Sequence, residues 1–274
     1  MSRYRELTEH LRGLEDIRAI LSGMRTLAAV ELQRVARLQA PAAQLRAGLE
    51  AAVAAHFAAR PAPAVAPGAG LWVVLGSEKG LCGDFNERLL AGLPDDAAPR
   101  VLVGSKLAAA PVSAVVARCP GALGADDLGP VLGTLAQTLA GLGAMAGGSL
   151  QVLCHDPQSQ QLRRVAVLPP PVGPAPAAAP RLQLPPAQFA AALLEQYLFA
   201  VFNGLLLDSL LAENQQRIAH LQAALQRLDE RCETLRQRQR RARQEQIIEE
   251  VEVALAIGGL TETIGSRSSQ GAEP

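Results

Sequence analysis

A glycine-rich loop at residues 76–83, GSEKGLCG, is the first segment whose residue types could do chemistry. It follows a short apolar run and precedes a predicted helix, so its backbone N–H groups could hold a phosphate at the helix N-terminus. The loop lacks the Gly-Lys-Ser/Thr ending of a P-loop and the glycine spacing of a dinucleotide-binding loop. We therefore predict a tight turn with positive φ angles, and keep nucleotide binding as the alternative.

A basic run at residues 235–243, LRQRQRRAR, carries five arginines and no acidic residue. A basic helix can bind nucleic acid or acidic lipid. No aromatic side chain interleaves to stack on bases, and the formal net charge of the chain is zero, so nucleic-acid binding is not expected. The alternatives are a solvated helix face and a cationic band that meets acidic loops of a protein partner. Arginines on all sides of the helix favour enclosure by partners.

Catalytic and metal-binding patterns are not predicted. The histidines are isolated, and His155 with Asp156 at a predicted strand end has no serine or cysteine partner that the sequence identifies. The four cysteines are scattered without a CxxC pair, so we expect free thiols and no zinc site. No carboxylate pair suggests acid–base work. We therefore expect no catalytic residue, no metal and no cofactor.

Two proline-free stretches, residues 1–40 and 187–273, indicate the long helices that must position these segments. In the C-terminal stretch, positions in alternating steps of four and three keep one stripe toward a partner helix. This seam comprises Leu211, Asn214, Ile218, Leu221, Leu225, Leu228, Cys232, Leu235, Gln239, Ala242 and Gln246. The helix is predicted to end near Ile257, before a stop signal at Gly258 and Gly259.

An N-terminal helix is predicted over residues 3–58, in which Pro41 either introduces a kink or ends a first segment. Glu31 is the one charge on its seam, and it either sets the register or faces water. The seam comprises Leu14, Ile17, Leu21, Met24, Ala28, Glu31, Val35, Leu38, Ala42, Leu45, Leu49 and Ala52. Because helices at opposite ends pair only if the middle folds back, we predict a long antiparallel two-helix coiled coil.

The middle of the chain alternates short apolar runs with helical patterns, which predicts a small Rossmann-like α/β domain with a mainly parallel sheet. Strands are predicted at residues 71–75, 101–103, 150–153 and 164–168, with antiparallel pairing left open for the last. Helices are predicted at residues 84–93 and 128–146, and proline-rich linkers at 61–70 and 169–186. The expected domains are an N-terminal helix at 1–60, the α/β domain at 68–170, a C-terminal helix at 186–260 and a disordered tail at 261–274.

No apolar run approaches the roughly 20 residues that span a bilayer. The richest stretch, residues 193–211, contains Glu195, Gln196, Asn203 and Asp208. The N-terminus has no apolar signal core, and its acidic residues argue against a transit peptide. We therefore expect a protein that is cytosolic or peripheral to a membrane through a partner.

Several segments resemble γ subunits of F-type ATP synthases. Residues 77–86, SEKGLCGDFN, resemble the family segment S-D-[RK]-G-L-C-G-x-x-N. Residues 17–35 are similar to its N-terminal helix TxKITKAMxMVAxxKMRR, with Met24 on the methionine. Residues 103–106 resemble the IGSKG turn, and residues 241–244 match KARQ, followed by Ile247 on the family's isoleucine. Ser209, Glu213 and Arg217 fall on the SExxxR pattern.

The resemblance implies a central-stalk rotor without catalytic residues, which couples ion translocation to ATP synthesis or hydrolysis. The terminal helices would turn inside a ring of three α and three β subunits, and the α/β domain would lie at the foot beside ε and the c-ring. It implies partner contacts at Met24, Arg243, Gln244 and Ile247, and a foot-domain turn at Gly80, Leu81, Cys82, Gly83 and Asn86. It further implies a peripheral position on the cytoplasmic face of a bacterial inner membrane, without a membrane span or nucleic acid.

Three segments depart from the family pattern. ELQRV at residues 31–35 replaces KMRR, the AMxxAtxNA run is altered at residues 220–221 and 231–232, and residues 247–260 differ from ITQELTEIVxGAxA. These departures suggest a divergent branch, such as the alternative Na⁺-linked F-type ATPases. A non-rotary coiled-coil adaptor and a small-molecule-binding α/β domain with helical arms remain the alternatives.

Overall fold

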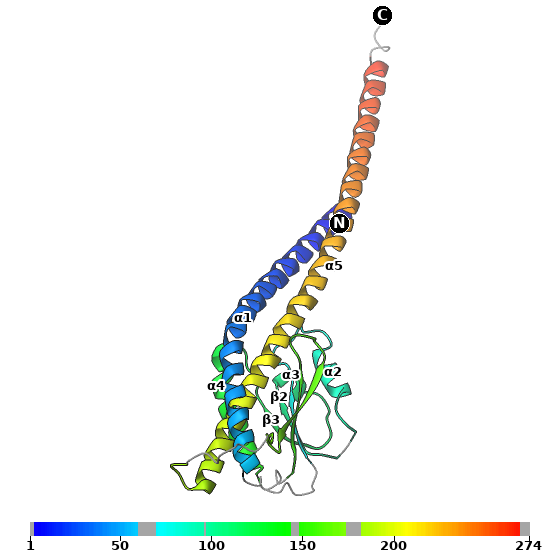
Figure 1. Cartoon of the computed structure of the whole chain (residues 1–274). Helices are drawn as coiled ribbons and strands as arrows, with labels where there is room; N and C mark the ends of the chain where they lie inside the picture. The colour runs from blue at the N-terminus through cyan, green and yellow to red at the C-terminus, as the bar shows by residue number, and fades with distance from the viewer. Residues whose placement is uncertain (1–2, 60–69, 96, 144–147, 174–181, 269–274) are drawn as a thin grey trace, which may run out of the picture. The chain divides into compact units, whose positions relative to one another are not determined.

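A computed structural model describes residues 3–59, 70–95, 97–143, 148–173 and 182–268. The chain divides into two compact units. Unit 1 comprises Met1–Gly23 and Gln222–Pro274, and unit 2 comprises Met24–Leu221. Both units contain parts of the two long helices labelled in Figure 1, α1 (Arg3–Ala59) and α5 (Pro186–Ser268).

Unit 2 contains a five-stranded sheet with the order β3-β2-β1-β4-β5. Its strands are β1 (Leu71–Leu75), β2 (Arg100–Val103), β3 (Val115–Cys119), β4 (Leu150–His155) and β5 (Leu162–Leu168). β1 pairs in parallel with β2 and β4, and β2 pairs in parallel with β3. β4 and β5 pair antiparallel. The predicted mainly parallel sheet is therefore confirmed, with its last strand antiparallel.

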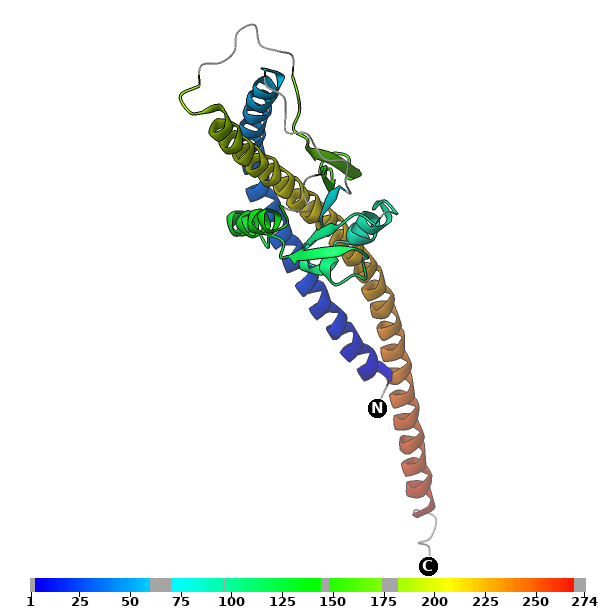
Figure 2. The same cartoon turned by 90° about the horizontal axis from the view of Figure 1, so that it is seen from below.

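Helices cover both faces of this sheet (Figure 2). The shorter ones are α2 (Phe85–Ala91), α3 (Ser105–Ala108), η1 (Ala125–Asp127) and α4 (Leu128–Gly141). On one face, Leu71, Val73 and Leu75 of β1 share a core with residues of α1, α4 and α5. On the other face, Trp72 and Val74 share a core with residues of α2 and α3. Burial on both faces explains why β1 is a continuous apolar run.

The N-terminal part of α5 belongs to the core of unit 2. Tyr197, Phe202 and Leu205 are all buried there, and the Tyr197 hydroxyl donates to the carbonyl oxygen of Val167 at 3.1 Å. By length and composition alone, α5 is apolar enough to cross a membrane, contrary to the expectation from the sequence. Core helices meet the same criterion, and the burial of these side chains explains the apolar composition.

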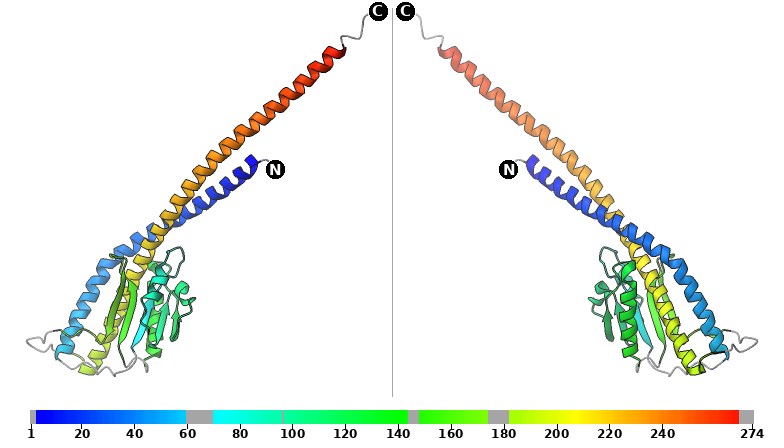
Figure 3. Two further views of the ribbon diagram at one scale, coloured as in Figure 1. Left: turned by 90° about the vertical axis from the view of Figure 1, so that its right-hand side faces the viewer. Right: turned by 90° about the vertical axis from the view of Figure 1, so that its left-hand side faces the viewer.

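Unit 1 pairs the first part of α1 with the later part of α5 (Figure 3). A small core of Leu14, Cys232 and Leu235 is flanked by polar contacts between the two helices. These contacts join Arg18 to Asp229 at 2.5 Å, Glu15 to Arg236 at 2.8 Å and Thr8 to Gln239 at 2.8 Å. Rising residue numbers on α1 meet falling numbers on α5, so the predicted antiparallel pairing is confirmed.

The predicted seam of α5 is confirmed, because each of its positions from Leu211 to Gln246 is buried or half-buried. The predicted seam of α1 is only partly correct. Ala42 and Leu49 are half-buried as predicted. The other inward positions between Val35 and Leu49 are Gln39 and Arg46, each one residue later than the predicted Leu38 and Leu45. The seam residues found exposed are Ile17 at 47%, Met24 at 39%, Leu38 at 43% and Leu45 at 53%, together with Ala52.

Several predicted ends differ from the structure. α1 continues through Pro41 and does not end there. α5 continues through Gly258 and Gly259 to Ser268, so the predicted stop is wrong. A glycine inside a helix costs only about 1 kcal/mol, which does not by itself end a long helix. α4 ends at Gly141 rather than at residue 146, and residues 144–147 and 269–274 lie outside the described residues.

Candidate functional site

The loop after β1, residues 76–83, lies against α5 within unit 2. Glu213 of α5 accepts hydrogen bonds from the backbone N–H groups of Glu78 at 3.3 Å and Lys79 at 3.2 Å. Arg217, one helical turn further on, pairs with Glu213 and donates from Nε to the carbonyl oxygen of Gly80 at 3.1 Å. We call Glu213, Arg217 and the loop backbone that they hold the loop clamp.

Both charged side chains of the loop clamp are buried, with Glu213 3% and Arg217 5% exposed. Nη1 of Arg217 also donates to Oδ1 of Asn214 at 2.9 Å. Burial raises the pKa of Glu213, while Arg217 and the two loop amides act to lower it. A buried ion pair is tolerated only when further hydrogen bonds satisfy its remaining donors and acceptors, as they do here.

Two residues of the loop have left-handed backbone conformations. Leu81 has a φ of 64° and Gly83 has a φ of 62°, so the predicted tight turn with positive φ is confirmed. A Cβ at Gly83 would lie 3.4 Å from Nδ1 of His220 on α5. The loop therefore approaches the helix closely at this point.

Cys82 and Asn86 hold the loop from its inner side. The Cys82 side chain is buried, which raises the pKa of its thiol. Oδ1 of Asn86 accepts from the backbone N–H of Ser77 at 3.0 Å, and Nδ2 donates to Ser77 Oγ at 2.8 Å. The Ser77 side chain is fully buried, so Asn86 supplies the partners that Ser77 cannot find in water.

The amide groups of this loop bind a carboxylate of the chain itself. A phosphate on Glu78 and Lys79 would have to displace Glu213, and the buried Arg217 would then lose its ion-pair partner. The geometry therefore argues against nucleotide binding by this loop.

Gly104 allows β2 to pass close to the start of the loop. Its φ is 106°, and a Cβ there would lie 2.7 Å from the carbonyl oxygens of both Gly76 and Ser77. We expect Gly104→Ala to lower the free energy of unfolding by about 2–4 kcal/mol, through backbone strain and this overlap. The measurement is denaturant unfolding followed by the fluorescence of Trp72, the single tryptophan of the chain.

Gly133→Ala is the matched control for this prediction. A Cβ at Gly133, inside α4, would meet nothing within 4 Å. Alanine is the better helix former by about 1 kcal/mol, so this variant should be as stable as the wild type or slightly more stable. Equal stability of both variants would contradict the expected strain at Gly104.

His155 at the end of β4 is buried and packs against Phe85. Its ring stacks on Phe85 with centroids 4.0 Å apart, and Nε2 lies 2.9 Å from the carbonyl oxygen of Phe85. The adjacent Cys154 directs Sγ toward the carbonyl oxygen of Arg163 at 3.9 Å rather than toward the ring. The contacts of His155 are those of a core residue and give no support to nucleophilic catalysis.

The contribution of His155 to the stability of unit 2 should fall as the pH falls below about 6.5, the ordinary pKa of histidine. Burial lowers the pKa of His155, and the positive charge of Arg88 lowers it further. The Phe85 carbonyl and Asp84 act to raise it but do not outweigh burial. Below 6.5 the unfolded chain takes up a proton that folded His155 excludes, so stability is lost between 6.5 and the lower folded pKa. The loss is at most about 1.4 kcal/mol per pH unit for one group.

This pH dependence can be checked by Trp72-monitored unfolding between pH 7.5 and 5.5. His155→Gln should flatten the curve over this range, whereas His220→Gln, at an exposed position of α5 in the same unit, should leave it as in the wild type. A curve that His155→Gln leaves unchanged would assign the pH dependence to other groups.

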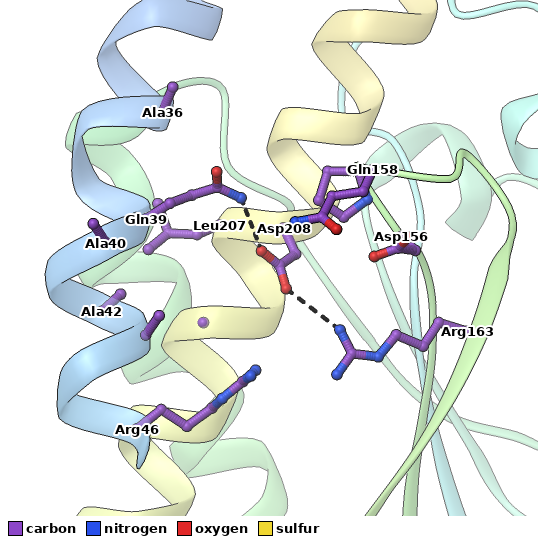
Figure 4. Close-up of a pocket in the computed structure, with 13 residues that line it drawn as sticks. Ala36, Gln39, Ala40, Ala42, Arg46, Asp156, Gln158, Arg163, Leu207 and Asp208 are labelled. Carbon is purple, nitrogen blue, oxygen red and sulfur yellow. Dashed lines mark hydrogen bonds and ion pairs between the residues drawn. The ribbon is translucent and has the colours of Figure 1, made fainter. Parts of the chain in front are cut away.

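A polar cavity of about 470 Å³ lies in unit 2 between α1, α5 and the turn after β4 (Figure 4). Gln39 donates to Asp208 at 3.0 Å, and Arg163 lies 3.8 Å from the same carboxylate. Burial raises the pKa of Asp208. Arg46 and Asp156 complete the charges of the lining, which therefore balance. This balance gives no preference for a ligand of either charge.

The basic run of residues 235–243 lies on α5 in unit 1. Arg236 pairs with Glu15, and Arg243 lies 5.8 Å from the ring centroid of Tyr4. The three others, Arg238, Arg240 and Arg241, are exposed and form no ion pair with any residue that the structure describes. These exposed guanidinium groups are free to donate to a partner molecule.

A comparison with protein families matches the ATP synthase family over residues 3–255 of the chain. The chain belongs to the ATP synthase γ-subunit family. This result confirms the family that the sequence motifs indicated, and with it the γ-subunit function. No curated protein sequence matches the chain.

Chains in solved structures of three mitochondrial ATP synthase assemblies have folds similar to that of this chain. A chain of the Euglena gracilis rotor in rotational state 1 has 13% identity and a TM-score of 0.63, with 89% of this chain and 98% of that chain covered. A chain of the Euglena gracilis OSCP/F1/c-ring assembly in rotational state 3 has 14% identity and a TM-score of 0.62, with 99% and 97% covered. A chain of the Tetrahymena thermophila central stalk and c-ring has 15% identity and a TM-score of 0.55, with 75% and 99% covered. At these identities the likeness shows the fold alone.

The residues predicted as partner contacts of this γ-family chain are all exposed. On α5 in unit 1, Arg243 and Gln244 are exposed, and Ile247 is 49% exposed. Met24 of α1, in unit 2, is 39% exposed. Their assignment as partner contacts stays a prediction.

The residues predicted as the foot-domain turn lie in or next to the loop that Glu213 and Arg217 hold. Gly80 contributes the carbonyl that Arg217 binds, whereas Asn86 acts through Ser77. Residue patterns did not identify Glu213 and Arg217 as site residues, although both matched the family's SExxxR segment. Local composition carried no signal, because Glu213 and Arg217 bound the polar run ENQQR, which is also typical of an exposed helix face, so the family segment was the available signal.

Proposed function

We propose that this chain is the central-stalk rotor of an F-type ATP synthase and couples ion translocation to the catalytic sites of a surrounding αβ ring. The observation that carries the proposal is the loop clamp, because a buried ion pair on α5 forms hydrogen bonds to the backbone of the loop that follows β1. A stalk must pass torque between a domain and a helix without slipping. A fixed network of charge-assisted hydrogen bonds meets this need better than apolar packing alone, because it is directional.

The proposed contacts with the αβ ring are Met24, Arg243, Gln244 and Ile247. Arginines suit acidic loops of a partner because their planar forks bind carboxylates in a fixed geometry. The exposed apolar groups of Met24 and Ile247 would each be buried by contact with the ring. The sheet of unit 2 would contact ε and the c-ring, and the catalytic residues would lie in the other subunits. The complex would lie at the cytoplasmic face of a bacterial inner membrane.

The test is co-expression of this chain with the α and β subunits of an F-type ATP synthase from the same organism. We expect one copy of the chain in each αβ ring, and rotation of a bead attached to the sheet of unit 2 during ATP hydrolysis. A fully active αβ complex that forms and turns over without this chain would overturn the proposal. A stable complex that hydrolyses ATP without bead rotation would support a non-rotary adaptor instead.

A further inference from the structure

Glu31 of α1 contacts the backbone of the loop that follows β3. Its Oε1 accepts a hydrogen bond from the backbone N–H of Ala125, the first residue of η1, at 2.6 Å. A Cβ at Gly124 would lie 2.9 Å from the same oxygen, so a side chain there would push the carboxylate of Glu31 aside. The charge on the α1 seam therefore neither faces water nor pairs with α5.

The same loop, residues 120–125, is held from its other side by the loop after β1. Glu78 Oε2 accepts from the backbone N–H of Gly121 at 2.7 Å, and Lys79 Nζ donates to the carbonyl oxygen of Leu123 at 2.5 Å. Glu78 also accepts from the N–H and the hydroxyl of Ser105. Burial acts to raise the pKa of Glu78, but these hydrogen bonds outweigh it and lower the pKa. The Glu78 carboxylate is thus held in its charged form.

These contacts form a continuous polar path within unit 2 from one long helix to the other. Glu213 on α5 binds the amides of Glu78 and Lys79, these two side chains bind the 120–125 loop, and Glu31 binds that loop from α1. Each step is a hydrogen bond to backbone, so movement of one helix pulls on main chain rather than on a free side chain.

We propose that Glu31 is a positioning residue that fixes α1 to the sheet through the 120–125 loop, so that α1 and α5 carry torque together. The torque role rests on the rotor function proposed above, whereas the anchoring of the loop does not. In the family segment that ELQRV replaces, KMRR begins with lysine. An ammonium group only donates, so it could not accept from the N–H of Ala125. The hydrogen bond to Ala125 therefore depends on the glutamate that this chain has at position 31.

The anchoring is tested on the full-length chain by hydrogen exchange of the peptide that contains Ala125. We expect Glu31→Ala to speed exchange there by about tenfold or more, the effect of losing a hydrogen bond to a charged acceptor. Gly124→Ala should give a similar increase, because its Cβ displaces the same oxygen. Glu31→Gln keeps an acceptor oxygen and should restore most of the protection, whereas Glu31→Lys should not.

Glu50→Ala is the matched control, since Glu50 lies on the same helix and pairs only with Arg46, at 3.6 Å, among its contacts given by the structure. This control should leave exchange at Ala125 unchanged. Unchanged exchange in both Glu31→Ala and Gly124→Ala would overturn the anchoring role.

The positioning role is tested in the complete membrane complex by the ions transported per ATP hydrolysed. Glu31→Ala should lower this ratio while the rate of ATP hydrolysis stays near the wild-type value, and Glu31→Gln should restore it. An unchanged ratio, despite faster exchange at Ala125, would overturn the torque role. A wild-type chain that fails to assemble with the αβ ring would overturn the proposed rotor function and the torque role with it, whereas the exchange comparison would still decide the anchoring.

Discussion

Arg217→Met is expected to lower the free energy of unfolding of unit 2 by about 3–5 kcal/mol, because it leaves the Glu213 carboxylate buried without a counter-charge. Methionine fills much of the same space, so the loss reports the charge rather than a cavity. The carbonyl oxygen of Gly80 and the side chain of Asn214 would lose their donors as well. Denaturant unfolding followed by Trp72 fluorescence measures the effect, because Trp72 lies in β1 and reports unit 2.

Two further variants sharpen this prediction. Arg37→Met removes an exposed arginine of α1 in the same unit and should change stability by no more than about 0.5 kcal/mol. The double variant Glu213→Leu with Arg217→Met removes both charges but leaves the amides of Glu78 and Lys79 without their acceptor. The double variant should therefore remain less stable than the wild type. In this respect the loop clamp differs from buried ion pairs whose replacement by apolar residues costs no stability. A loss below about 1 kcal/mol in Arg217→Met would show that water or another group compensates Glu213.

Arg243→Glu is expected to lower the coupled turnover of the assembled complex by about tenfold or more. A tenfold loss corresponds to about 1.4 kcal/mol. One hydrogen bond to a charged group can contribute more than this, so the loss of one such bond is enough. The reversal of charge would also repel the acidic partner loops that the proposed function requires. The isolated chain should stay folded, since Arg243 is exposed and its polar contacts among the described residues are a hydrogen bond and a cation–π contact with Tyr4. ATP-driven ion pumping by the reconstituted complex measures coupled turnover, and circular dichroism of the isolated chain checks its folding.

Arg12→Glu is the control for this experiment, because Arg12 is exposed on α1 and lies outside the basic run. It should leave turnover near the wild-type value. Arg243→Lys should restore activity only in part, since lysine keeps the charge but loses the planar fork. Wild-type turnover in Arg243→Glu would remove this residue from the proposed contact with the αβ ring.

Strongly apolar and strongly periodic segments could be predicted from the sequence. β1 is buried on both faces and reads as an uninterrupted apolar run, so its bounds were predicted correctly. The heptad seam of α5 was also predicted correctly, because its larger side chains leave few alternative stripes. β3 was missed because it is an edge strand whose side chains are mostly half-buried or exposed, so its sequence shows no clear pattern.

The inward face of α1 could be predicted only in part. Leu38 and Leu45 fit a heptad seam better than their neighbours Gln39 and Arg46, yet the structure turns the polar residues inward. Gln39 finds a partner in Asp208 and Arg46 finds one in Glu50, which offsets the cost of removing their polar groups from water. A helix rich in alanine and leucine offers several apolar stripes, and the choice among them depends on what lies opposite.

By itself, the sequence determined the α/β class, the two long terminal helices and their antiparallel pairing, since local periodicity and apolar runs carry that information. The tertiary structure alone decided the chemistry of the glycine-rich loop. A loop with this composition could bind a phosphate, and only the folded chain places Glu213, more than a hundred residues further on, against its amides. The same holds for Glu31, whose partner at Ala125 lies 94 residues away. Contacts between residues so distant leave no periodic trace in one sequence, because each depends on how the sheet and both helices pack.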